Sequence, residues 1–409
     1  MLLRSFLIAA VSSHRWLLDP SLAVLSFLSK PRQGLLSVES NPILYAIFKK
    51  TLYNHFCAGE NSAEVTTTIK QIKDMGFKGV ILTYAREVVV DASGKDGNTI
   101  AQQSESPSGA SKASQDPDIE AWRQGVLETV QMVGEGDYLA LKFTGAGKTA
   151  LDCLASGEPL APQMSDAINE LCEEAAKRGA SILVDAEQQF VQASIDAVAL
   201  ELMEKYNRSG KAVVYNTYQA YLKSTPGTLR QHLKLAKAKN FTIGVKLVRG
   251  AYINSEPRPL INDTKQDTDN SYDFISRGLL SFKYGGIEGE LPKVDLFLAT
   301  HNKESALKAH NLQKARSDCG LPMTKLQYGQ LLGMADEVSC TLLQLGQAAS
   351  GCRPAVSPEV YKCLSWGTLG DCLSYLLRRA LENRDAVSRT KTEYLALRAE
   401  VWRRLLGSL

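Results

Sequence analysis

The chain has 409 residues, of which 44% are hydrophobic and 22% are charged, and these are ordinary values for a soluble globular protein. Its formal net charge of +3 is too small to predict binding to nucleic acid or to an anionic membrane through bulk charge. Its eight cysteines form no CxxC pair, which predicts no metal ribbon or thioredoxin-like site and reduced thiols in an intracellular compartment.

The N-terminal segment, residues 1–29, is rich in Leu, Ala and Ser and contains a single acidic residue, Asp19. Polar residues 12–15 and Pro20 interrupt its apolar runs, which fall short of the ~20 apolar residues that span a bilayer. Three interpretations stay open. The segment is a cleaved transit peptide, a helix that packs on the domain or on a membrane surface, or the remainder of a chain whose natural start lies upstream.

Secondary structure is expected in a regular order after this segment. Residues 64–75 predict a helix with apolar side chains at helical spacing, and from residue 79 onward short β-branched runs alternate with further helices. The expected strands are residues 79–86, 138–144, 181–187, 212–219, 243–249, 295–301, 325–331 and 360–366. The other expected helices are residues 167–178, 190–206, 229–238, 304–315 and 392–406.

Strands that alternate with helices pair in parallel through right-handed crossovers, in either an open doubly wound sheet or a closed barrel. The count of eight strands and the missing GxGxxG after the first strand favour an α/β fold of the (β/α)8 TIM-barrel type, with extra N-terminal helices. We assign residues 1–63 to a helical, targeting-like segment, 64–389 to the barrel and 390–409 to a C-terminal helix. Residues 91–118 have almost nothing to bury, so they predict a disordered surface insertion.

Polar residues end five of the expected strands, where a strand buried on both faces is normally apolar. They are Lys142, Asp185 with Glu187, Gln219, Lys246 with Arg249, and Thr300 with His301 and Asn302. In a (β/α)8 barrel the active site lies at the carboxyl ends of the strands. Each residue alone is also explained by a buried ion pair, but the group predicts a functional site.

A helix after the last strand carries Tyr375, Arg378, Arg379 and Glu382 on one sector. An exposed ion pair would explain these residues too. The helix comes directly after the last strand, however, so it begins at the barrel mouth, and this position favours a functional role. Arginine binds a carboxylate with two parallel hydrogen bonds, so Lys142 and the two arginines predict a site for a small anion. Asp185 and Glu382 would orient these cations, whereas Lys246 and Arg249 would face a second, electron-rich partner such as a cofactor.

Five segments then resemble the signature blocks of the proline dehydrogenase family, as found in fungal mitochondria. They are NTYQAYLK (residues 216–223), VKLVRGAY (245–252), ATHN (299–302), YGQLLGM (328–334) and YLLRRALEN (375–383). The resemblance extends from about residue 64 to 389. It implies a distorted barrel that holds FAD noncovalently and oxidises L-proline to Δ1-pyrroline-5-carboxylate. It also implies electron transfer to a membrane quinone and peripheral contact with the matrix side of the mitochondrial inner membrane.

The resemblance also implies a role for each residue. Lys142, Arg378 and Arg379 would hold the proline carboxylate, braced by Asp185 and Glu382, while Tyr252, Leu331 and Tyr375 would shape the pocket around the ring. The residues that would contact FAD are Gln219, Lys246, Arg249, Gly250, Thr300, His301 and Asn302.

One position departs from the family pattern, because many members carry tyrosine where this chain has Cys363. Either Cys363 is a lineage variant of an enzyme that uses proline, or the smaller side chain admits trans-4-hydroxyproline. Tyr361 or Trp366 would restore the lost volume if either filled the space. A rival flavin barrel, similar to methylenetetrahydrofolate reductase, would not need the paired arginines. A barrel without catalysis is disfavoured by the complete charged set, and an NAD-linked enzyme by the missing fingerprint.

Overall fold

A computed structural model describes residues 2–28, 38, 40–85, 115–349, 356–382 and 387–405. Its chain forms two compact units. The barrel unit comprises Ile69–Gln330 and Val338–Cys363, and the terminal unit comprises Met1–Thr68, Leu331–Glu337 and Leu364–Leu409. The predicted insertion at residues 91–118 lies outside the described residues except for its last four positions.

Eight strands form a closed barrel in chain order, which confirms the predicted (β/α)8 architecture. The strands are β1 (Gly79–Tyr84), β2 (Tyr138–Leu141), β3 (Ser181–Val184), β4 (Val214–Gln219), β5 (Ile243–Val248), β6 (Val294–Ala299), β7 (Lys325–Leu331) and β8 (Glu359–Trp366). Neighbouring strands from β1 to β7 pair in parallel, with registers such as Thr217 opposite Lys246.

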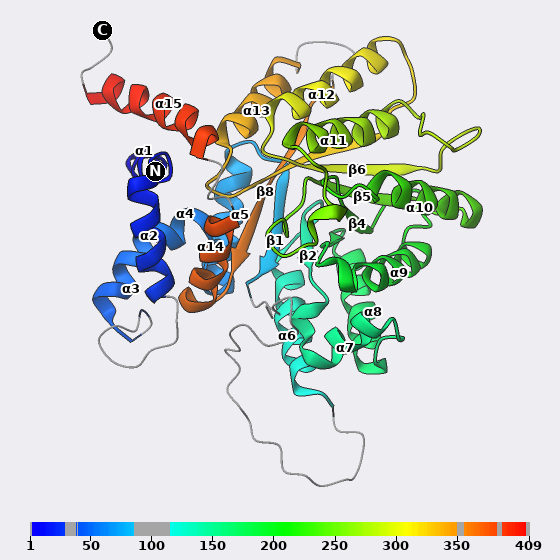
Figure 1. Ribbon diagram of the computed structural model, residues 1–409, viewed down its shortest axis with the longest axis horizontal. Helices are drawn as coiled ribbons and strands as arrows, with labels where there is room; N and C mark the ends of the chain where they lie inside the picture. Colours follow the sequence, from blue (N-terminus) through cyan, green and yellow to red (C-terminus); the bar gives the residue numbers. More distant parts are fainter. Residues whose placement is uncertain are drawn as a thin grey trace. The chain divides into compact units, whose positions relative to one another are not determined.

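The helices alternate with these strands, and Figure 1 shows α8 to α12 on the outside of the sheet. The barrel unit contains α6 (Pro117–Met132), η2 (Thr144–Ala146), α7 (Lys148–Ser156), α8 (Pro162–Lys177), α9 (Gln189–Tyr206), α10 (Thr225–Lys239), η3 (Arg258–Leu260), α11 (Lys265–Leu280), α12 (Lys303–Asp318) and most of α13 (Asp336–Ala349). The first two residues of α13 belong to the terminal unit. Helix α5 (Ser62–Asp74) crosses the boundary between the units.

The predicted strands were correct in number and order, but most of them ended too late. Five of the eight end one to three residues before the predicted boundary, as β2 does at Leu141 and β3 at Val184. The segments lost from the strands begin with the polar residues Lys142 and Asp185. These side chains therefore lie on connections just beyond the strand ends, where a barrel presents its site.

Large aromatic side chains fill the barrel interior below these ends. Tyr138, Tyr215, Phe297 and Tyr361 form one fully buried cluster with tilted and edge-to-face ring contacts. Their hydroxyls are paired within the cluster or with Gln327, which donates to Tyr361 Oη at 2.9 Å. This packed interior leaves the carboxyl ends of the strands as the place for a ligand.

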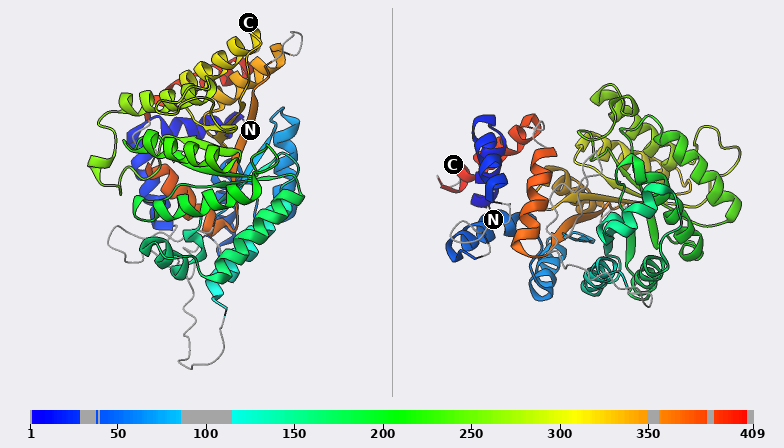
Figure 2. Two further views of the ribbon diagram at one scale, coloured as in Figure 1. Left: turned by 90° about the vertical axis from the view of Figure 1, so that its right-hand side faces the viewer. Right: turned by 60° about the horizontal axis from the view of Figure 1, so that its bottom comes forward.

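The terminal unit is helical and gathers both ends of the chain. It contains α1 (Leu2–Ser12), α2 (Arg15–Leu28), α3 (Pro42–Phe48), the π-helical turn η1 (Lys49–Tyr53), α4 (Asn54–Phe56), α14 (Leu369–Glu382) and α15 (Val387–Leu405). Helices α1 and α15 pack together (Figure 2). Within this contact Phe6 stacks on Tyr394. No helix among the described residues has the length and apolar character needed to cross a membrane.

The start of α14 is held by the segment that follows α3. Glu60 accepts a hydrogen bond from Leu369 N at 2.8 Å and pairs with Lys49 at 2.6 Å. Tyr53 Oη donates to Gly367 O at 2.7 Å, in the turn between β8 and α14. These contacts fix the helix that carries Tyr375, Arg378, Arg379 and Glu382 within the terminal unit.

Candidate active site

A charged pair joins the ends of two strands at the barrel mouth. Lys246 Nζ, on β5, lies 2.5 Å from Oδ1 of Asp185, which directly follows β3, so the pair spans the end of β4. The side chains are only 12% and 17% exposed. Sequence reasoning expected Asp185 to orient Lys142 and the arginines, and it did not foresee this partner.

Arg249, just after β5, lies in a network of polar side chains. Its Nε contacts Asp269 at 2.7 Å, and its two terminal nitrogens donate to Thr300 Oγ1 at 2.7 Å and to Ser305 Oγ at 3.0 Å. The guanidinium also lies 4.4 Å from the ring centre of Tyr272. These contacts use three of the five N–H donors of the arginine. The remaining donors are available to a ligand.

The carboxyl group of Asp269 is the acidic partner of this network. Burial raises its pKa, but hydrogen bonds from Lys265 and Arg249 outweigh burial and hold the pKa below its ordinary value. Asp269 therefore stays ionised and keeps the Arg249 guanidinium in a fixed orientation.

Gln219 and Glu187 connect the ends of β3, β4 and β5. Gln219 Nε2 donates to Glu187 O at 3.3 Å, and its Oε1 accepts from Ala251 N at 3.2 Å. The Glu187 carboxylate accepts from the amides of Phe143 and Thr144, at 3.0 and 3.2 Å, and from the Thr144 hydroxyl. Glu187 thus anchors the connection after β2 that carries the half-buried Lys142.

Backbone constraints explain the glycine after Arg249. Gly250 has φ of +144°, and a Cβ atom there would lie 2.1 Å from Tyr221 Cδ1. Only glycine tolerates both the conformation and the close approach of the tyrosine ring. Tyr252 follows in the same loop and is half-buried.

The three predicted residues after β6 lie together, beside Arg249. Thr300 Oγ1 accepts from Arg249 and also from Asn302 N at 3.0 Å. Asn302 is the N-cap of α12, and its side chain accepts from Ser305 N at 3.1 Å. His301 is half-buried between them in the chain.

The predicted site residues therefore fall into two groups. Ten belong to the barrel unit, namely Lys142, Asp185, Gln219, Lys246, Arg249, Gly250, Tyr252, Thr300, His301 and Asn302. Five belong to the terminal unit, namely Leu331, Tyr375, Arg378, Arg379 and Glu382. Tyr375 is half-buried on α14. The side chains of Arg378, Arg379 and Glu382 lie outside the described part of the structure.

Sequence reasoning missed Asp269, Ser305 and Tyr272, which surround Arg249. They lie on α11 and α12, 20 or more positions along the chain, in segments without distinctive motifs. A search for a carboxylate able to pair with Arg249 would have found Asp269 among several equal candidates.

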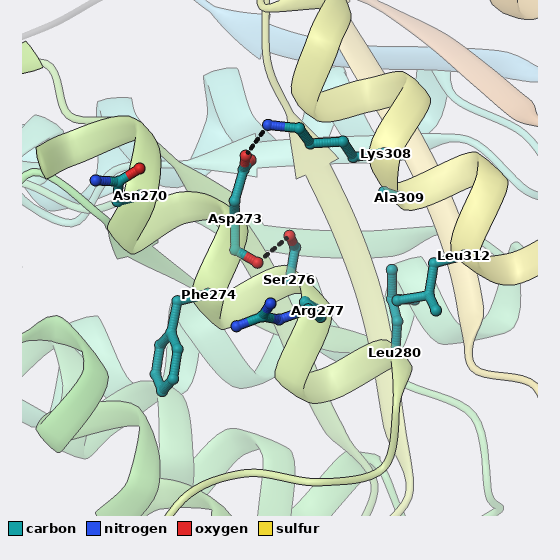
Figure 3. A pocket seen from close by; sticks show the side chains of 9 residues that line it. All are labelled: Asn270, Asp273, Phe274, Ser276, Arg277, Leu280, Lys308, Ala309 and Leu312. Atoms are coloured by element: carbon teal, nitrogen blue, oxygen red, sulfur yellow. Dashed lines mark hydrogen bonds and ion pairs between the residues drawn. The ribbon is translucent and has the colours of Figure 1, made fainter. Parts of the chain in front are cut away.

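A groove of about 560 Å³ lies on the outer helices α11 and α12. Figure 3 shows Lys308 directed toward Asp273, at 3.0 Å, with Phe274 and Arg277 beside them. Asp273 also accepts from Ser305 Oγ at 2.6 Å, so the Arg249 network reaches this groove. No predicted site residue lines it.

Comparison with known proteins identifies the family of the chain. Residues 65–392 match the family model described as proline dehydrogenase. The chain is 31% identical to the "Probable proline dehydrogenase, mitochondrial" of Schizosaccharomyces pombe, over 98% of this chain and 88% of that protein. It is 29% identical to the hydroxyproline dehydrogenase of Mus musculus, over 88% of this chain and 83% of that protein.

A solved structure shares the fold. Proline utilization A from Bdellovibrio bacteriovorus, inactivated by N-propargylglycine, superposes with a TM-score of 0.67 at 16% identity. The match covers 91% of this chain and 38% of that chain. The family inferred from the sequence segments is thus confirmed. The chain belongs to the proline dehydrogenase family of oxidoreductases.

Proposed function

We propose that the protein catalyses the FAD-dependent oxidation of L-proline to Δ1-pyrroline-5-carboxylate and passes the electrons to a membrane quinone. The observation that carries this proposal is the pair of cations on one strand end, Lys246 and Arg249, each held by a carboxylate in a barrel of this family. Fixed donors at the mouth of a barrel suit an electron-rich cofactor, and the family match supplies the substrate class.

The residues at the strand ends fit FAD by their donor chemistry. Lys246 keeps two ammonium hydrogens beyond its bond to Asp185, and Arg249 keeps two guanidinium N–H groups. Gln219 adds one amide hydrogen close in the chain of contacts to Gly250, since its Oε1 accepts from the amide of the next residue, Ala251. These groups would hold the isoalloxazine and its attached phosphates, with Thr300, His301 and Asn302 completing the contacts. When bound, FAD supplies the acceptor for a hydride from C5 of proline.

The residues of the chain would act by binding and orientation. Lys142, Arg378 and Arg379 would hold the proline carboxylate, with Glu382 and Asp185 bracing them. Tyr252, Leu331 and Tyr375 would exclude water around the ring. Holding the carboxylate at one end and the ring at the other restricts the substrate to the reactive orientation. The substrate amine must be neutral to give up hydride, and its proton would pass to water.

Arg249→Lys tests the cofactor assignment, because lysine keeps the charge but cannot reach Asp269, Thr300 and Ser305 together. We expect the variant to bind FAD at least tenfold more weakly than the wild type. The free FAD that passes an ultrafiltration membrane measures this affinity. Arg316→Lys is a matched control, because Arg316 is a half-buried arginine whose guanidinium donates to Pro322 O and lies over the Phe282 ring, before β7 begins. Equal flavin affinity in both variants would remove Arg249 from the cofactor site.

The reaction itself is tested by incubating the purified protein with L-proline and a soluble quinone. We expect stoichiometric formation of reduced quinone and Δ1-pyrroline-5-carboxylate, identified by mass spectrometry. Quinone reduction without this product, or no reduction at all, would contradict the proposal.

We propose a location on the matrix side of the inner membrane, with peripheral contact through α2. The relatives named as mitochondrial support the organelle. Leu22 and Leu25 of α2 are buried, whereas Trp16, Val24 and Phe27 are exposed on another face, Trp16 at 71%. Helix α15 exposes Leu395 and Trp402 beside Arg398 and Arg403. Aromatic and apolar side chains with flanking arginines are typical of helices that lie in an anionic lipid surface.

Vesicle binding tests this contact. Changing Trp16, Val24 and Phe27 together to Ser should weaken binding to vesicles of phosphatidylcholine and cardiolipin at least tenfold, because three apolar side chains leave the lipid. Leu321→Ser, at an exposed apolar residue of the barrel unit, is the control and should bind like the wild type. Equal binding by both variants would exclude α2 from the contact.

Hydroxyproline oxidation is a second candidate function. It is favoured by the similarity to mouse hydroxyproline dehydrogenase and by Cys363, which is half-buried against the barrel interior cluster. Tyr361 belongs to the cluster against which Cys363 packs, and its hydroxyl accepts a hydrogen bond from Gln327. The ratio of kcat/KM for L-proline and trans-4-hydroxyproline decides between them, and Cys363→Tyr should shift this ratio toward proline.

A further inference from the structure

The connection between β5 and α11 is a long loop whose ends are tied to the segment after β4. Tyr221 N donates to Arg249 O at 2.7 Å, and Asn262 N donates to Tyr221 O at 2.7 Å. Between these ties the chain turns at Tyr252, whose carbonyl accepts from the amides of Ser255 and Glu256 at 3.0 and 2.9 Å. Long loops at the mouth of a barrel commonly carry function, so what holds the middle of this loop matters.

The side chain of Glu256 reaches from this turn to the beginning of another helix. Its Oε1 accepts a hydrogen bond from Gln189 N at 2.7 Å, and the residue is 9% exposed. Gln189 is the first residue of α9, and the N-cap residue Gln188 supplies no side-chain bond to the helix. A helix N-terminus presents unpaired amides with partial positive charge, which a carboxyl oxygen satisfies. Glu256 therefore caps α9 from a distant part of the chain.

We propose that Glu256 is a positioning residue that latches the β5–α11 loop, and with it Tyr252, to the N-terminus of α9. Two consecutive hydrogen bonds connect the elements, from Gln189 N to the Glu256 carboxyl group and from Glu256 N to Tyr252 O. Helix α9 follows β3 and Asp185 closely, so the latch fixes Tyr252 relative to the Lys246–Asp185 pair.

The latch responds to pH. Burial raises the pKa of Glu256, and the bond from Gln189 only partly opposes this. Burial, and then the charge of Glu256, raise the pKa of the neighbouring Tyr221, which stays neutral. Arg258, in the same loop, donates instead to the carbonyls of Ile261, Asn262 and Asp263. Because the pKa is higher in the latched loop, proton binding favours that state, so the latch strengthens at low pH and weakens as pH rises through the raised pKa.

Hydrogen exchange of the loop amides in the full chain tests the latch without requiring turnover. Glu256→Ala should lower the protection factors of the amides at residues 252–256 about fivefold or more, because the cap and the turn are lost. Glu256→Gln keeps the acceptor oxygen and is always neutral, so it should retain protection and lose the pH dependence that the wild type shows as pH rises above the ordinary glutamate pKa of about 4.3. Asp263→Asn is the matched control, because this carboxylate of the same loop is 78% exposed and should leave protection unchanged.

Unchanged protection in Glu256→Ala would overturn the latch. Loosening in Glu256→Gln equal to that in Glu256→Ala would also overturn it, since glutamine can still accept the bond from Gln189. A kinetic measurement, which rests on the proposed proline oxidation, tests the consequence for Tyr252. Glu256→Ala should raise KM for L-proline about fivefold while kcat changes less than twofold, and an unchanged KM would overturn the positioning role. Absence of proline turnover in the wild type would instead count against the proposed function.

Discussion

Lys246 Nζ and Asp185 Oδ1, 2.5 Å apart, join the carboxyl ends of β5 and β3 across β4. Both side chains are largely removed from water, so their attraction is offset by the cost of desolvating two charges. Removing one partner leaves the other charge buried and uncompensated, which costs more than removing both. The pair thus makes the stability of the barrel mouth depend on residues proposed to act in the reaction.

Lys246→Met should lower the free energy of unfolding by about 2–4 kcal/mol, measured by urea denaturation. The double variant with Asp185→Asn should recover part of this loss, because no unpaired charge remains. Lys148→Met, which breaks an exposed pair with Asp152, should change stability little. If the effects of Lys246→Met and Asp185→Asn simply add, the two residues are not energetically coupled.

Gly250→Ala should destabilise the protein by about 1–3 kcal/mol, because its φ is positive and the new Cβ would meet the Tyr221 ring. Thermal and urea unfolding measure this change, and released flavin reports whether the displaced loop also weakens the cofactor site. Gly285→Ala is the control, since no atom lies within 4 Å of a Cβ there. Equal stability of the two variants would show that the loop relaxes without cost.

We expect His310, on α12, to make the stability of the folded protein sensitive to acid. Burial, and then the charge of Lys314, lowers its pKa below the ordinary value near 6.5. The unfolded chain therefore binds the proton more tightly, so stability present above pH 6.5 is lost as pH falls through that value. His310→Gln should make the decline between pH 7 and pH 5.5 shallower, by up to about 1 kcal/mol per pH unit. The measurement is the free energy of unfolding of both proteins against pH. If the two curves stay parallel from pH 8 downward, His310 does not cause the loss of stability in acid.

Arg378→Met tests the proposed carboxylate clamp. Loss of a two-bond contact with the proline carboxylate should raise the dissociation constant for L-proline roughly 100-fold, which corresponds to about 2–4 kcal/mol of binding free energy. The measurement is the dissociation constant for L-proline in an anaerobic titration. Arg404→Met, on the exposed end of α15 beside Glu400, removes a charge elsewhere and should bind proline normally. Unchanged affinity in Arg378→Met would remove Arg378 from the clamp.

The barrel was predictable because apolar strands and amphipathic helices differ in period, and because eight repeats close a barrel. The strand ends were less predictable, since Lys142 and Asp185 continue an apolar run in the sequence although the chain has already left the sheet. The same residues mark the end of the barrel where we propose the site, so an error in the strand boundaries did not change the predicted location.

The partners within the site could not be read from spacing. The sequence offers Asp185 several possible cationic partners at the strand ends. Only the three-dimensional geometry assigns it to Lys246. Asp269 and Ser305 reach Arg249 from two helices, and Glu256 reaches Gln189 across 67 positions. Such contacts depend on how helices pack around the barrel, which local periodicity does not specify.

The most direct test is the visible spectrum of the purified protein during anaerobic addition of L-proline. The account predicts a yellow protein with the absorbance of an oxidised flavin, which bleaches as proline is added. A protein without flavin, or a flavin that neither proline nor trans-4-hydroxyproline reduces, would contradict it.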